Sequence, residues 1–549
     1  MSEAGLPQSS AAKMRWWGWG EAEPMLDAHQ LALLSQRVGQ LQRVCPPVAL
    51  SAVRLDPSRL HDTAAQALRA ALPDGVICSD HEQRVRHAAG RSYLDLLRLR
   101  AGEPLGAPDA VLFPQSAAEI QSVLEACHEH SVAVVPFGGG TSVVGGVEPL
   151  RGAHHAVISL DLSRVASIVR VDRTSLIVTA GAGLRVAVLE RHLATRGLTL
   201  GHFPQSFEHV SLGGCAATRS AGQSSTGYGR FTDMVQGLSV LTPTGPLTLQ
   251  AFPATAAGPD LRELVLGSEG VLGVISQLDL RVRQRPEHEL YEGFFFKDFT
   301  GGCEALRELA QTQHAPTLAR LSDRSETAIS MAMAGSGSAS QRLGRRYLAL
   351  RGYSEGCLAI LGFSGSQRTV QRQRRGALEI IRRNGGLAVG RSPGKAWVSQ
   401  RFSAPYLRDE LMTHGVMVET LETATRWSNL LRLHRDVGER IDRELRVMGT
   451  PAIVMCHVSH IYETGASLYF TVLARQQPGA EIEQWQSVKR AASEVILAAG
   501  GTITHHHAVG SDHSRWLASE IGPEGMRALA ALKDAFDPDG IMNPGKLLA

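Results

Sequence analysis

The chain has 549 residues, enough for two or three domains, and its 43% hydrophobic and 20% charged residues are ordinary for a soluble globular protein. Its 56 basic and 53 acidic residues nearly balance, so the composition gives no support for nucleic-acid binding. The seven cysteines are scattered and never have Cys-x-x-Cys spacing, which argues against a disulfide framework or a zinc ribbon and favours a reducing compartment.

The sequence has no recognisable targeting signal or membrane-spanning segment. Residues 1–12 lack the apolar core of a signal peptide, and no run of about 18 uncharged apolar residues occurs. The C-terminal Lys546-Leu547-Leu548-Ala549 differs from the Ser-Lys-Leu peroxisomal signal. We therefore expect a cytoplasmic protein without a transmembrane helix.

The N-terminal region is expected to be disordered up to about residue 13. The segment from Met14 to Gly20 then contains three of the seven tryptophans. We favour a segment strapped across another domain, with a partner-binding patch as the alternative. Helical periodicity follows from about Ala28 to Ala71, interrupted at Cys45-Pro46-Pro47.

A glycine-rich stretch from Pro136 to Glu148 follows a predicted capping box (Ser116 and Glu119), a helix to His130 and a buried strand at 132–135. Glycine lets backbone N–H groups approach a ligand with no Cβ in the way, so a pyrophosphate is the predicted ligand. The stretch lacks the Lys of a Walker loop and the helix-opening pattern of a Rossmann loop. A glycine hairpin without a ligand is the alternative.

Two more segments of small residues follow, at 201–224 and 267–275, among predicted strands at 156–160 and 175–180 and a helix at 184–196. Three such loops within about 140 residues are hard to explain as turns alone. They predict an extended cofactor that contains phosphate. After Arg285-Pro286 the loops stop and arginine and helix formers increase, which marks a domain boundary.

The region beyond residue 286 begins with two surface features. The Ser- and Gly-rich stretch from Met331 to Gly344 is expected to be a mobile loop. Residues 368–383 predict a basic helix with a thin apolar face. A solvated helix is the usual explanation of that pattern, and docking on an anionic membrane surface is the other.

The last third is dense in polar residues, at 406–409, at 456–471 and in the triplet His505-His506-His507. In a strand at 468–473, Tyr469 would share a face with Thr471. Three adjacent histidines cannot all enter one site, so two of the three are expected to do so. Histidine supplies proton transfer near neutral pH, and tyrosine can act as a base where neighbours lower its pKa.

A zinc site is the competing interpretation of the histidine triplet. It is disfavoured because the chain has no His-Glu-x-x-His helix and no pair of cysteine ligands. Histidines with a purely structural role are the third interpretation.

The three glycine loops, Gly201-His202-Phe203-Pro204, residues 406–409, residues 465–470 and the histidine triplet resemble the vanillyl-alcohol oxidase and p-cresol methylhydroxylase superfamily of flavoproteins. Within it the chain looks like the alkyldihydroxyacetonephosphate synthase family, from Trp17-Gly18-Trp19-Gly20 to Gly545. The resemblance implies an α+β fold: a mostly helical segment (1–104), an FAD-binding domain (105–285), a cap domain of antiparallel sheet and helices (286–500) and a C-terminal segment (501–549) that returns to the flavin.

The resemblance also implies FAD, bound without a covalent link because Thr141 stands where members with covalent flavin often carry His. Gln205 departs from the Asp of the animal enzymes. The residues that the resemblance places against FAD are Pro136, Phe137, Gly138, Gly139, Gly140, Thr141, Ser142, Gln205, Ser206, Ser211, Gly213, Thr218, Arg219, Ser220, Ala221, Gly267, Ser268, Glu269, Gly270, Val271, Leu272, Gly273 and Ile275.

In the family's mechanism the flavin attacks C1 of acyl-dihydroxyacetone phosphate, the acid leaves and a long-chain alcohol replaces it, without net oxidation, in ether lipid synthesis. By analogy Tyr469 exchanges the C1 proton, Arg408 pairs with the phosphate and Arg320 supports the site. The remaining implied catalytic residues are His202, His505, His506 and His507. The expected partners are a phosphorylated lipid-like substrate and a long-chain alcohol, without a metal; peripheral membrane contact and a homodimer are compatible with the sequence.

Two rival functions use the same scaffold. A 2-hydroxyacid dehydrogenase would transfer hydride to FAD, and several such enzymes place a metal-binding His after Gly-Asp-Gly-Asn-Leu. This chain has Tyr469 after Gly465-Ala466-Ser467-Leu468, which favours the synthase. A membrane-docked flavoprotein without catalysis is the second rival, and retention of Tyr469 and the histidine triplet argues against it.

Overall fold

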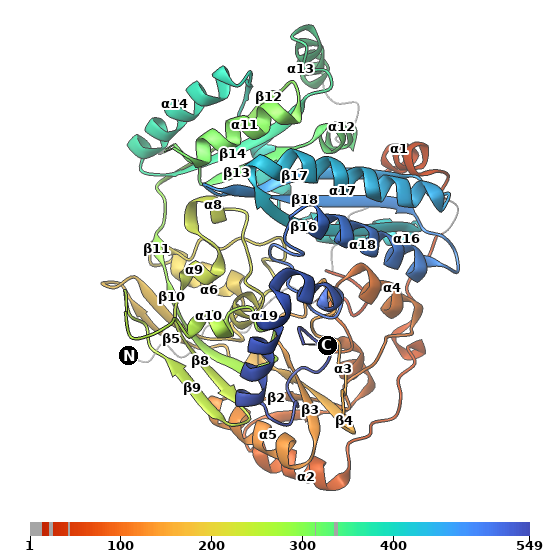
Figure 1. Ribbon diagram of the computed structural model, residues 1–549, viewed down its shortest axis with the longest axis vertical. Coiled ribbons are helices and arrows are strands. Elements are labelled where there is room, and N and C mark those ends of the chain that lie inside the picture. The colour runs from red at the N-terminus through yellow and green to blue at the C-terminus, as the bar shows by residue number, and fades with distance from the viewer. Residues whose placement is uncertain (1–13, 21–25, 42–43, 313, 334–338, 549) are drawn as a thin grey trace.

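The computed structural model describes residues 14–20, 26–41, 44–312, 314–333 and 339–548. The predicted disorder before Met14 lies outside these ranges. The described chain forms a lower part with two main sheets and one two-stranded sheet, and an upper part built on one large sheet (Figure 1). The last long helix, α19 (Ser514–Phe536), lies in front of the lower part.

The first sheet of the lower part has the strand order β1-β2-β4-β3. Its strands are β1 (Val76–Cys78), β2 (Ala110–Phe113), β3 (Val132–Phe137) and β4 (Ala156–Asp161), and β2, β4 and β3 run parallel. Helices α2 (Asp62–Ala71) and α5 (Ala117–Glu129) pack on it. Parallel strands are covered on both faces, which explains the unbroken apolar run that precedes the first glycine loop.

Only half of the predicted capping box forms at the start of α5. The Ser116 hydroxyl accepts from the backbone N–H of Glu119, as predicted. The Glu119 carboxylate, however, accepts from the N–H groups of Asp74 and Gln115 at 2.8 and 2.6 Å. The Glu119 carboxylate therefore ties α5 to the turn before β1, and it does not accept from the backbone N–H of Ser116 as a complete capping box requires.

The second sheet is antiparallel, in the order β5-β6-β10-β8-β9. Its strands are β5 (Ile168–Asp172), β6 (Ile177–Gly181), β8 (Val235–Thr242), β9 (Gly245–Leu249) and β10 (Val274–Arg281). Helices α6 (Val186–Ala194) and α7 (Leu212–Ala217) pack on its apolar face around Leu189, Leu212 and Leu278. The second and third glycine loops leave this unit and meet the first sheet at the edge that carries the first loop.

The upper part is a seven-stranded antiparallel sheet in the order β15-β12-β14-β13-β17-β18-β16, which confirms the predicted cap of antiparallel sheet and helices. Its strands are β12 (His288–Phe296), β13 (Leu318–Ser322), β14 (Cys357–Gly365), β15 (Leu387–Gly390), β16 (Val416–Arg426), β17 (Ala452–Ile461) and β18 (Gly465–Arg475). Helices α11 (Phe299–Ala310), α14 (Gln367–Arg383), α17 (Trp427–Val447) and α18 (Glu481–Ala498) pack on its outer face (Figure 1).

The remaining short elements connect these layers. They are α3 (His81–Arg86), α4 (Tyr93–Ala101), α8 (Ser225–Tyr228), α9 (Phe231–Met234), α10 (Arg262–Val265), α12 (Arg324–Met333), α13 (Ala339–Leu350), α15 (Ser392–Gln400), α16 (Ala404–Thr413), β7 (Leu198–Thr199), β11 (Arg283–Gln284) and the 3₁₀ turns at Leu50–Ala52 and Leu162–Arg164. Among the described helices, none is both long and apolar enough to cross a membrane.

The tryptophan-rich segment lies across the two parts, as the strap interpretation predicts. Trp16 and Trp19 are buried, and the backbone N–H of Trp19 donates to the Asp409 carboxylate of α16 at 2.7 Å. The Gly18 carbonyl accepts from the Arg91 guanidinium at 3.0 Å. A Cβ on Gly18 would lie 2.4 Å from the Asp409 carboxylate, so the strap requires glycine at this point.

The helical region that follows the strap is divided between the two parts. Helix α1 (Ala28–Val38) buries Leu34 and Val38 against Ile453 and Leu473 of the upper sheet. Helix α2 packs on the lower sheet instead. The N-terminal segment is therefore shared between both parts and does not form a unit of its own.

The mobile loop predicted from Met331 to Gly344 is wrong at both ends. Helix α12 continues to Met333, and α13 begins at Ala339. The Ser- and Gly-rich composition is confined to the centre, and the flanking residues are good helix formers. Residues 334–338, at that centre, lie outside the described residues.

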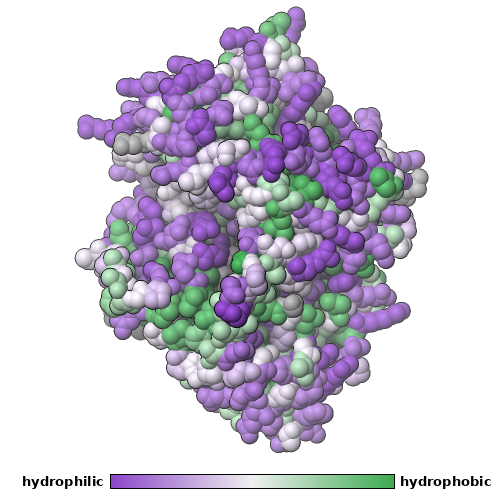
Figure 2. Space-filling model, in the orientation of Figure 1, coloured by the Kyte–Doolittle hydropathy of each residue, from purple (hydrophilic) through white to green (hydrophobic). Residues whose placement is uncertain are grey.

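The predicted basic helix is α14, and it packs on the upper sheet through Val370, Ala377 and Ile380. Arg374 pairs with Glu292 of β12 at 2.6 Å. The upper half of the face seen in Figure 2 is mostly hydrophilic. These features agree with a solvated helix.

Burial of α17 generates the first prediction. Leu433 is fully buried between this helix and the upper sheet, whereas Val447 at the end of the same helix is 83% exposed. We expect Leu433→Ala to lower the free energy of unfolding by about 2–5 kcal/mol, because it leaves a cavity in the core. Val447→Ala should change it by less than about 0.5 kcal/mol. Denaturant unfolding followed by tryptophan fluorescence measures both, and equal effects would contradict the described packing.

Candidate active site

A cavity of about 740 Å³ lies between the two parts. The glycine loops of the lower part form one wall, and strands β16, β17 and β18 of the upper sheet form the opposite wall. Residues from the strap, α1, α12 and α16 close its sides. A ligand in this cavity would contact segments separated by hundreds of residues in the sequence.

The first glycine loop packs against the second so tightly that side chains are excluded. A Cβ on Gly138 would lie 2.2 Å from the Ser211 hydroxyl, and one on Gly139 would lie 2.1 Å from the His209 carbonyl. Gly140 has φ +64°, which glycine adopts without strain. Glycine is therefore required at this wall by contact with the protein itself, and the cavity is lined there by backbone.

The structure brings most of the residues predicted to bind the cofactor to this cavity. The predicted residues that line it are Pro136, Phe137, Gly138, Gly139, Gly140, Thr141, Ser142, Gln205, Ser206, Ser211, Gly213, Thr218, Ser220, Glu269, Gly270, Gly273 and Ile275. Six predicted residues do not line it: Arg219, Ala221, Gly267, Ser268, Val271 and Leu272. Arg219 instead pairs with Glu263, and Val271 and Leu272 pack against Val509 and Leu517.

The C-terminal segment fastens the glycine loops to one another. The Asn543 side-chain amide donates to the Gly146 carbonyl at 3.1 Å and to the Glu269 carbonyl at 2.7 Å. The Glu269 carboxylate in turn accepts from the N–H groups of Val509 and Gly510 at 2.8 and 2.7 Å. Asn543 could not be predicted as a site residue, because nothing in the local sequence shows which loops a terminal segment will contact.

The upper wall is a polar face created by strand register. Glu422 of β16 lies opposite Tyr469 of β18, which lies opposite His457 of β17. Thr420 and Thr471 form the adjacent pair, and Tyr469 and Thr471 both line the cavity, as the alternation predicts. The intervening Phe470 points to the other face, into the core beneath α17.

Tyr469 is buried in this wall, and burial raises its pKa to about 12. A hydrogen bond with Thr420 and the charge of Arg408 act in the opposite direction but are weaker. His507 meets the Tyr469 ring edge-on at 5.6 Å, and burial lowers the pKa of His507 to about 3. The expectation that neighbouring groups lower the pKa of the Tyr469 phenol is therefore wrong, because desolvation outweighs them.

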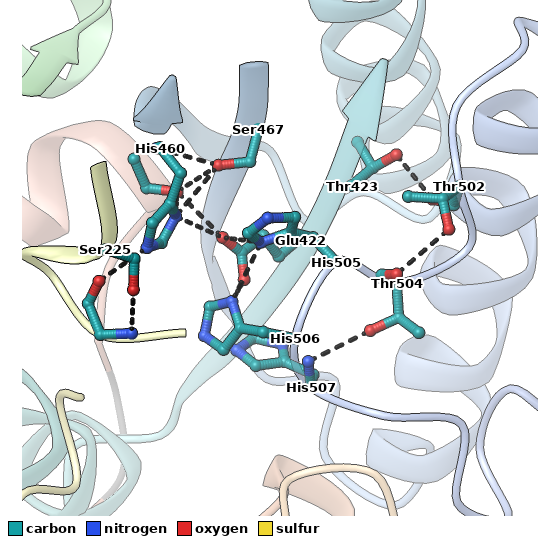
Figure 3. A network of polar contacts seen from close by, with 12 residues as sticks. Ser225, Glu422, Thr423, His460, Ser467, Thr502, Thr504, His505, His506 and His507 are labelled. Atoms are coloured by element: carbon teal, nitrogen blue, oxygen red, sulfur yellow. Dashed lines mark hydrogen bonds and ion pairs between the residues drawn. The ribbon is translucent and has the colours of Figure 1, made fainter. Parts of the chain in front are cut away.

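The histidine triplet divides between two sides. His506 and His507 line the cavity, whereas His505 does not and instead meets the Tyr462 hydroxyl at 2.6 Å. Figure 3 shows the triplet beside Glu422. Two of the three histidines thus enter the site, as expected. His505 and His506 both turn their Nδ1 atoms to the carboxylate of Glu422.

Glu422 was missed by the sequence analysis. It is a single acid within a strand, and only the pairing of β16 with β18 and the return of the C-terminal segment place it beside the triplet. Burial disfavours its ionised form, but the charges of His506 and His505 outweigh burial and hold the pKa of Glu422 well below its usual range.

Arg408 lies in the cavity wall on α16 and is 7% exposed. Its guanidinium donates to the Arg91 carbonyl at 3.1 Å and to the Thr420 hydroxyl at 3.2 Å. Neither acceptor is charged, and no carboxylate of the described residues forms an ion pair with it. Its charge is therefore available to an anion in the cavity.

Arg320 also lines the cavity, but its charge is compensated. It contacts Glu326 and lies 2.9 Å from Nε2 of His457. Burial raises the pKa of Glu326, yet His457 and Arg320 more than offset it and lower that pKa to about 2. Arg320 therefore fits the supporting position predicted for it.

His202 does not line the cavity. It is fully buried, and its Nε2 lies 3.1 Å from the hydroxyl of Ser220, which does line it. Burial lowers the pKa of His202 to about 3, so the ring is neutral. It contacts the cavity through Ser220.

Two groups of three side chains in the described chain could hold a metal ion. They are Glu422, His460 and His505, and Glu422, His506 and His507. Both use Glu422, so the carboxylate is the centre of either arrangement.

The comparisons with known proteins agree with this geometry. Residues 108–249 match an FAD binding domain, and residues 285–547 match the C-terminal domain of FAD linked oxidases. The chain is 32% identical to an alkyldihydroxyacetonephosphate synthase of Dictyostelium discoideum, over 92% of this chain and 83% of the relative. It is likewise 32% identical to one of Trypanosoma brucei brucei, over 90% and 82%.

This chain belongs to the alkyldihydroxyacetonephosphate synthase family. A solved structure of such a synthase aligns with a TM-score of 0.84 at 29% identity, covering 97% of this chain and 98% of the other. A solved p-cresol methylhydroxylase aligns at 0.68 and 15% identity over 90% and 99%, which shows a shared fold. The predicted α+β fold and superfamily are confirmed.

FAD is the cofactor, as predicted. The residues present fit it: the first loop offers backbone where no Cβ can stand, and hydroxyls of Ser142, Ser206 and Thr218 border the same space. Serine and threonine hydroxyls and backbone N–H groups are suitable partners for phosphate oxygens.

The two hydrogen bonds from Asn543 to the first and third glycine loops, which we call the C-terminal clamp, lead to the second prediction. We expect Asn543→Gly to weaken FAD binding about tenfold or more, because it removes two hydrogen bonds between loops of about 1 kcal/mol each. Glycine tolerates the positive φ of 39° at this position, so only the side chain is tested. The measurement is recovery of flavin fluorescence on dilution of the holoenzyme.

The matched control is Asn384→Ala. This change also removes two side-chain hydrogen bonds, to Glu308 and Ile380, but in the upper part away from the cavity. Equal FAD release from both variants would show that the clamp has no specific role.

Proposed function

We propose that this enzyme forms alkyl-dihydroxyacetone phosphate from acyl-dihydroxyacetone phosphate and a long-chain alcohol, with non-covalent FAD and no net redox change. The observation that carries the proposal is one cavity that contains the uncompensated Arg408, the buried phenol of Tyr469 and an apolar arm. These three features correspond to the phosphate, the reacting carbon and the lipid chain of such a substrate.

The phosphate end is assigned to Arg408. A guanidinium that already donates to two neutral oxygens is fixed in orientation, and its remaining N–H groups can bind a phosphate. Arg320 is less suited to this role because Glu326 already compensates it. The uncompensated charge of Arg408 supports a phosphorylated substrate over an uncharged one.

The lipid end is assigned to the arm of the cavity between α1, α12, α16 and the upper sheet. Its lining is mostly apolar, and the apolar residues are Leu26, Leu34, Ile329, Met333, Leu407, Leu411, Val418, Met455 and Leu473. Each methylene of a chain that enters this arm would contribute about 0.8 kcal/mol from burial. Such a surface supports a long acyl or alkyl group and has no evident use for a small hydroxyacid.

Proton transfer at the reacting carbon is assigned to Tyr469. FAD, when bound, supplies the nucleophile that displaces the acid. Tyr469 would exchange the C1 proton as the phenolate, so its own hydroxyl proton must first pass to a neutral neighbour such as His507, whose ring lies 5.6 Å from it. Thr420 orients the Tyr469 hydroxyl. Arg408 also hydrogen-bonds Thr420, so the residue that binds phosphate and the residue that moves the proton are joined by one hydroxyl. Substrate binding at Arg408 would thereby align the phenol with C1.

Cytoplasmic location, peripheral membrane contact and a homodimer remain predictions. The hydroxyacid dehydrogenase alternative is weaker. Relatives with such names are more distant: a glycolate oxidase subunit GlcD of Bacillus subtilis is 25% identical over 80% of this chain.

The decisive experiment mixes the holoenzyme anaerobically with palmitoyl-dihydroxyacetone phosphate, D-lactate or D-2-hydroxyglutarate in parallel. We expect bleaching of the flavin only with the first substrate, with release of palmitate and recovery of the oxidised spectrum on addition of hexadecanol. Bleaching only with a hydroxyacid, with recovery only on addition of an electron acceptor, would identify a dehydrogenase.

Tyr469→Phe is expected to reduce kcat at least 100-fold while FAD stays bound, because it removes only the proton-transferring hydroxyl. Stopped-flow turnover and the flavin spectrum are the measurements. Thr471→Val is a control on the same face of β18. A near-normal rate in Tyr469→Phe would remove the assigned role.

Arg408→Ala is expected to raise KM for the phosphorylated substrate by about 10–100-fold, because a charge-assisted contact contributes about 1.5–3 kcal/mol. Arg408→Lys should recover only part of the loss, since lysine lacks the fork. Arg374→Ala, which breaks an ion pair outside the cavity, is the matched control. Initial-rate kinetics measure the change, and an unchanged KM in Arg408→Ala would refute phosphate binding by this residue.

A further inference from the structure

A second cavity, of about 550 Å³, lies near the point where the chain passes from β11 of the lower part to β12 of the upper part (Figure 1). We call it the junction pocket. Its walls come from α8 and β11 on one side, and from α14, the end of β14 and the residues before β13 on the other. Its polar lining includes Thr226, Tyr228, Arg283, Thr317, Ser364 and Gln373. No described residue lines both this pocket and the candidate active site.

The lower and upper parts are in close contact at the junction pocket. The Gly227 N–H donates to the Thr317 carbonyl at 3.0 Å, and a Cβ on Gly227 would lie 2.7 Å from the Thr317 Cα. The Tyr228 hydroxyl lies 3.0 Å from the Ser364 hydroxyl, which joins α8 to β14. A ligand in the pocket would therefore contact both parts at once.

Arg283 brings an uncompensated positive charge to the pocket. Its guanidinium donates to the Tyr228 carbonyl at 3.2 Å and lies over the Tyr228 ring at 5.6 Å, so its position is fixed. No carboxylate of the described residues forms an ion pair with it. Glu190 and Glu289, whose charges reach Tyr228, bond to other residues. The remaining N–H groups of the guanidinium are available to an anion.

A second arginine adds to the positive potential. Arg281 stands two residues before Arg283, and the intervening Val282 is buried, so both arginines lie on the opposite side of the strand. Arg281 likewise has no ion pair within the described chain. Burial lowers the pKa of Arg283, and the charge of Arg281 lowers it further. An anion bound nearby would relieve this repulsion.

Three hydroxyls in the wall leave one hydrogen-bond donor unused. The Ser364 hydroxyl lies 3.0 Å from that of Tyr228 and 2.8 Å from that of Thr317. Each of these two contacts uses one O–H, whichever atom donates, because each hydroxyl has one hydrogen. The third O–H therefore needs an acceptor that the described residues do not supply.

Two further polar atoms of the wall lack a partner. Oγ1 of Thr226 and Oε1 of Gln373 are buried and make no hydrogen bond. Buried polar atoms are normally paired, so these two atoms indicate a polar ligand. A ligand hydroxyl suits both positions, because it can donate and accept.

We propose that the junction pocket binds a small phosphate monoester that carries hydroxyl groups. Its phosphate would accept from Arg283 and from the unused O–H of the three wall hydroxyls, and its own hydroxyls would meet Thr226 and Gln373. The pocket volume is in the range of sites for small molecules. This site is separate from the phosphate contact assigned to Arg408 and does not depend on the proposed function.

The test is isothermal titration calorimetry of the FAD-loaded enzyme with inorganic phosphate, sn-glycerol 3-phosphate or glycerol. We expect sn-glycerol 3-phosphate to bind at least about tenfold more tightly than inorganic phosphate, and glycerol to give no signal. Arg408→Ala removes the contact assigned to the active site, so binding that survives in this variant belongs to the junction pocket. Adding Arg283→Ala to Arg408→Ala should weaken that binding at least about tenfold, because a charge-assisted contact is lost.

Arg285→Ala is the matched control. Arg285 is an exposed arginine two residues after Arg283, and it does not line the pocket. This change should leave the affinity within about twofold. Because a ligand that binds only the folded state stabilises it, sn-glycerol 3-phosphate should raise Tm in Arg285→Ala and not in Arg283→Ala. Hydrogen exchange should slow at residues 225–228 when the ligand binds.

Three outcomes would overturn the proposal. The first is no binding of either phosphate compound by the Arg408→Ala enzyme at millimolar concentration, which decides the matter even if Arg283→Ala fails to fold. The second is unchanged affinity after Arg283→Ala. The third is equal affinity for inorganic phosphate and sn-glycerol 3-phosphate, which would exclude a role for the ligand hydroxyls. None of these measurements requires turnover, so failure here is distinct from failure of the proposed synthase activity.

Discussion

The antiparallel pairing of β16, β18 and β17 is the constraint on which the site depends. Its register places Glu422, Tyr469 and His457 side by side and sends the intervening apolar residues into the core beneath α17. A shift of one residue in the register of β18 would turn the Tyr469 phenol away from the cavity into the hydrophobic core and turn Phe470 toward the cavity. The hydrophobic face of the sheet therefore fixes the chemistry of the polar face.

Burial governs the charge balance of the cavity. Desolvation keeps most of its histidines neutral and its phenol protonated, while the ionised Glu326 is matched by Arg320. Arg408 is the exception, because its contacts are neutral oxygens. An anionic substrate would compensate the charge of Arg408. Water would compensate it poorly, because the surrounding dielectric is low.

The p-cresol methylhydroxylase aligns over 90% of this chain at 15% identity, so the two proteins share a fold, and one fold can host different reactions. Fold alone therefore cannot assign the reaction. In this chain the features that bear on the reaction are side chains on the cap wall and the aliphatic arm beside α1. The strap carrying Trp19 holds that arm closed on one side through its bond to Asp409.

The sequence by itself determined the features that are local. The glycine loops, the strand before the first loop, the alternation that pairs Tyr469 with Thr471 and the helix with basic residues at 368–383 all follow from short-range patterns and were found. The family motifs added the fold and FAD. Local patterns misplaced the ends of the loop at 331–344, since a Ser- and Gly-rich centre says little about its flanks.

Only the tertiary structure decided which distant residues meet. Glu422 reaches the histidine triplet because β16 pairs with β18 and the C-terminal segment folds back over both. Asn543 joins the first and third glycine loops across hundreds of residues of chain. It also decided that Tyr469 has a raised pKa, because burial is a property of packing. Sequence spacing determines which residues share a face, whereas register, chain return and desolvation depend on contacts between segments far apart in the chain.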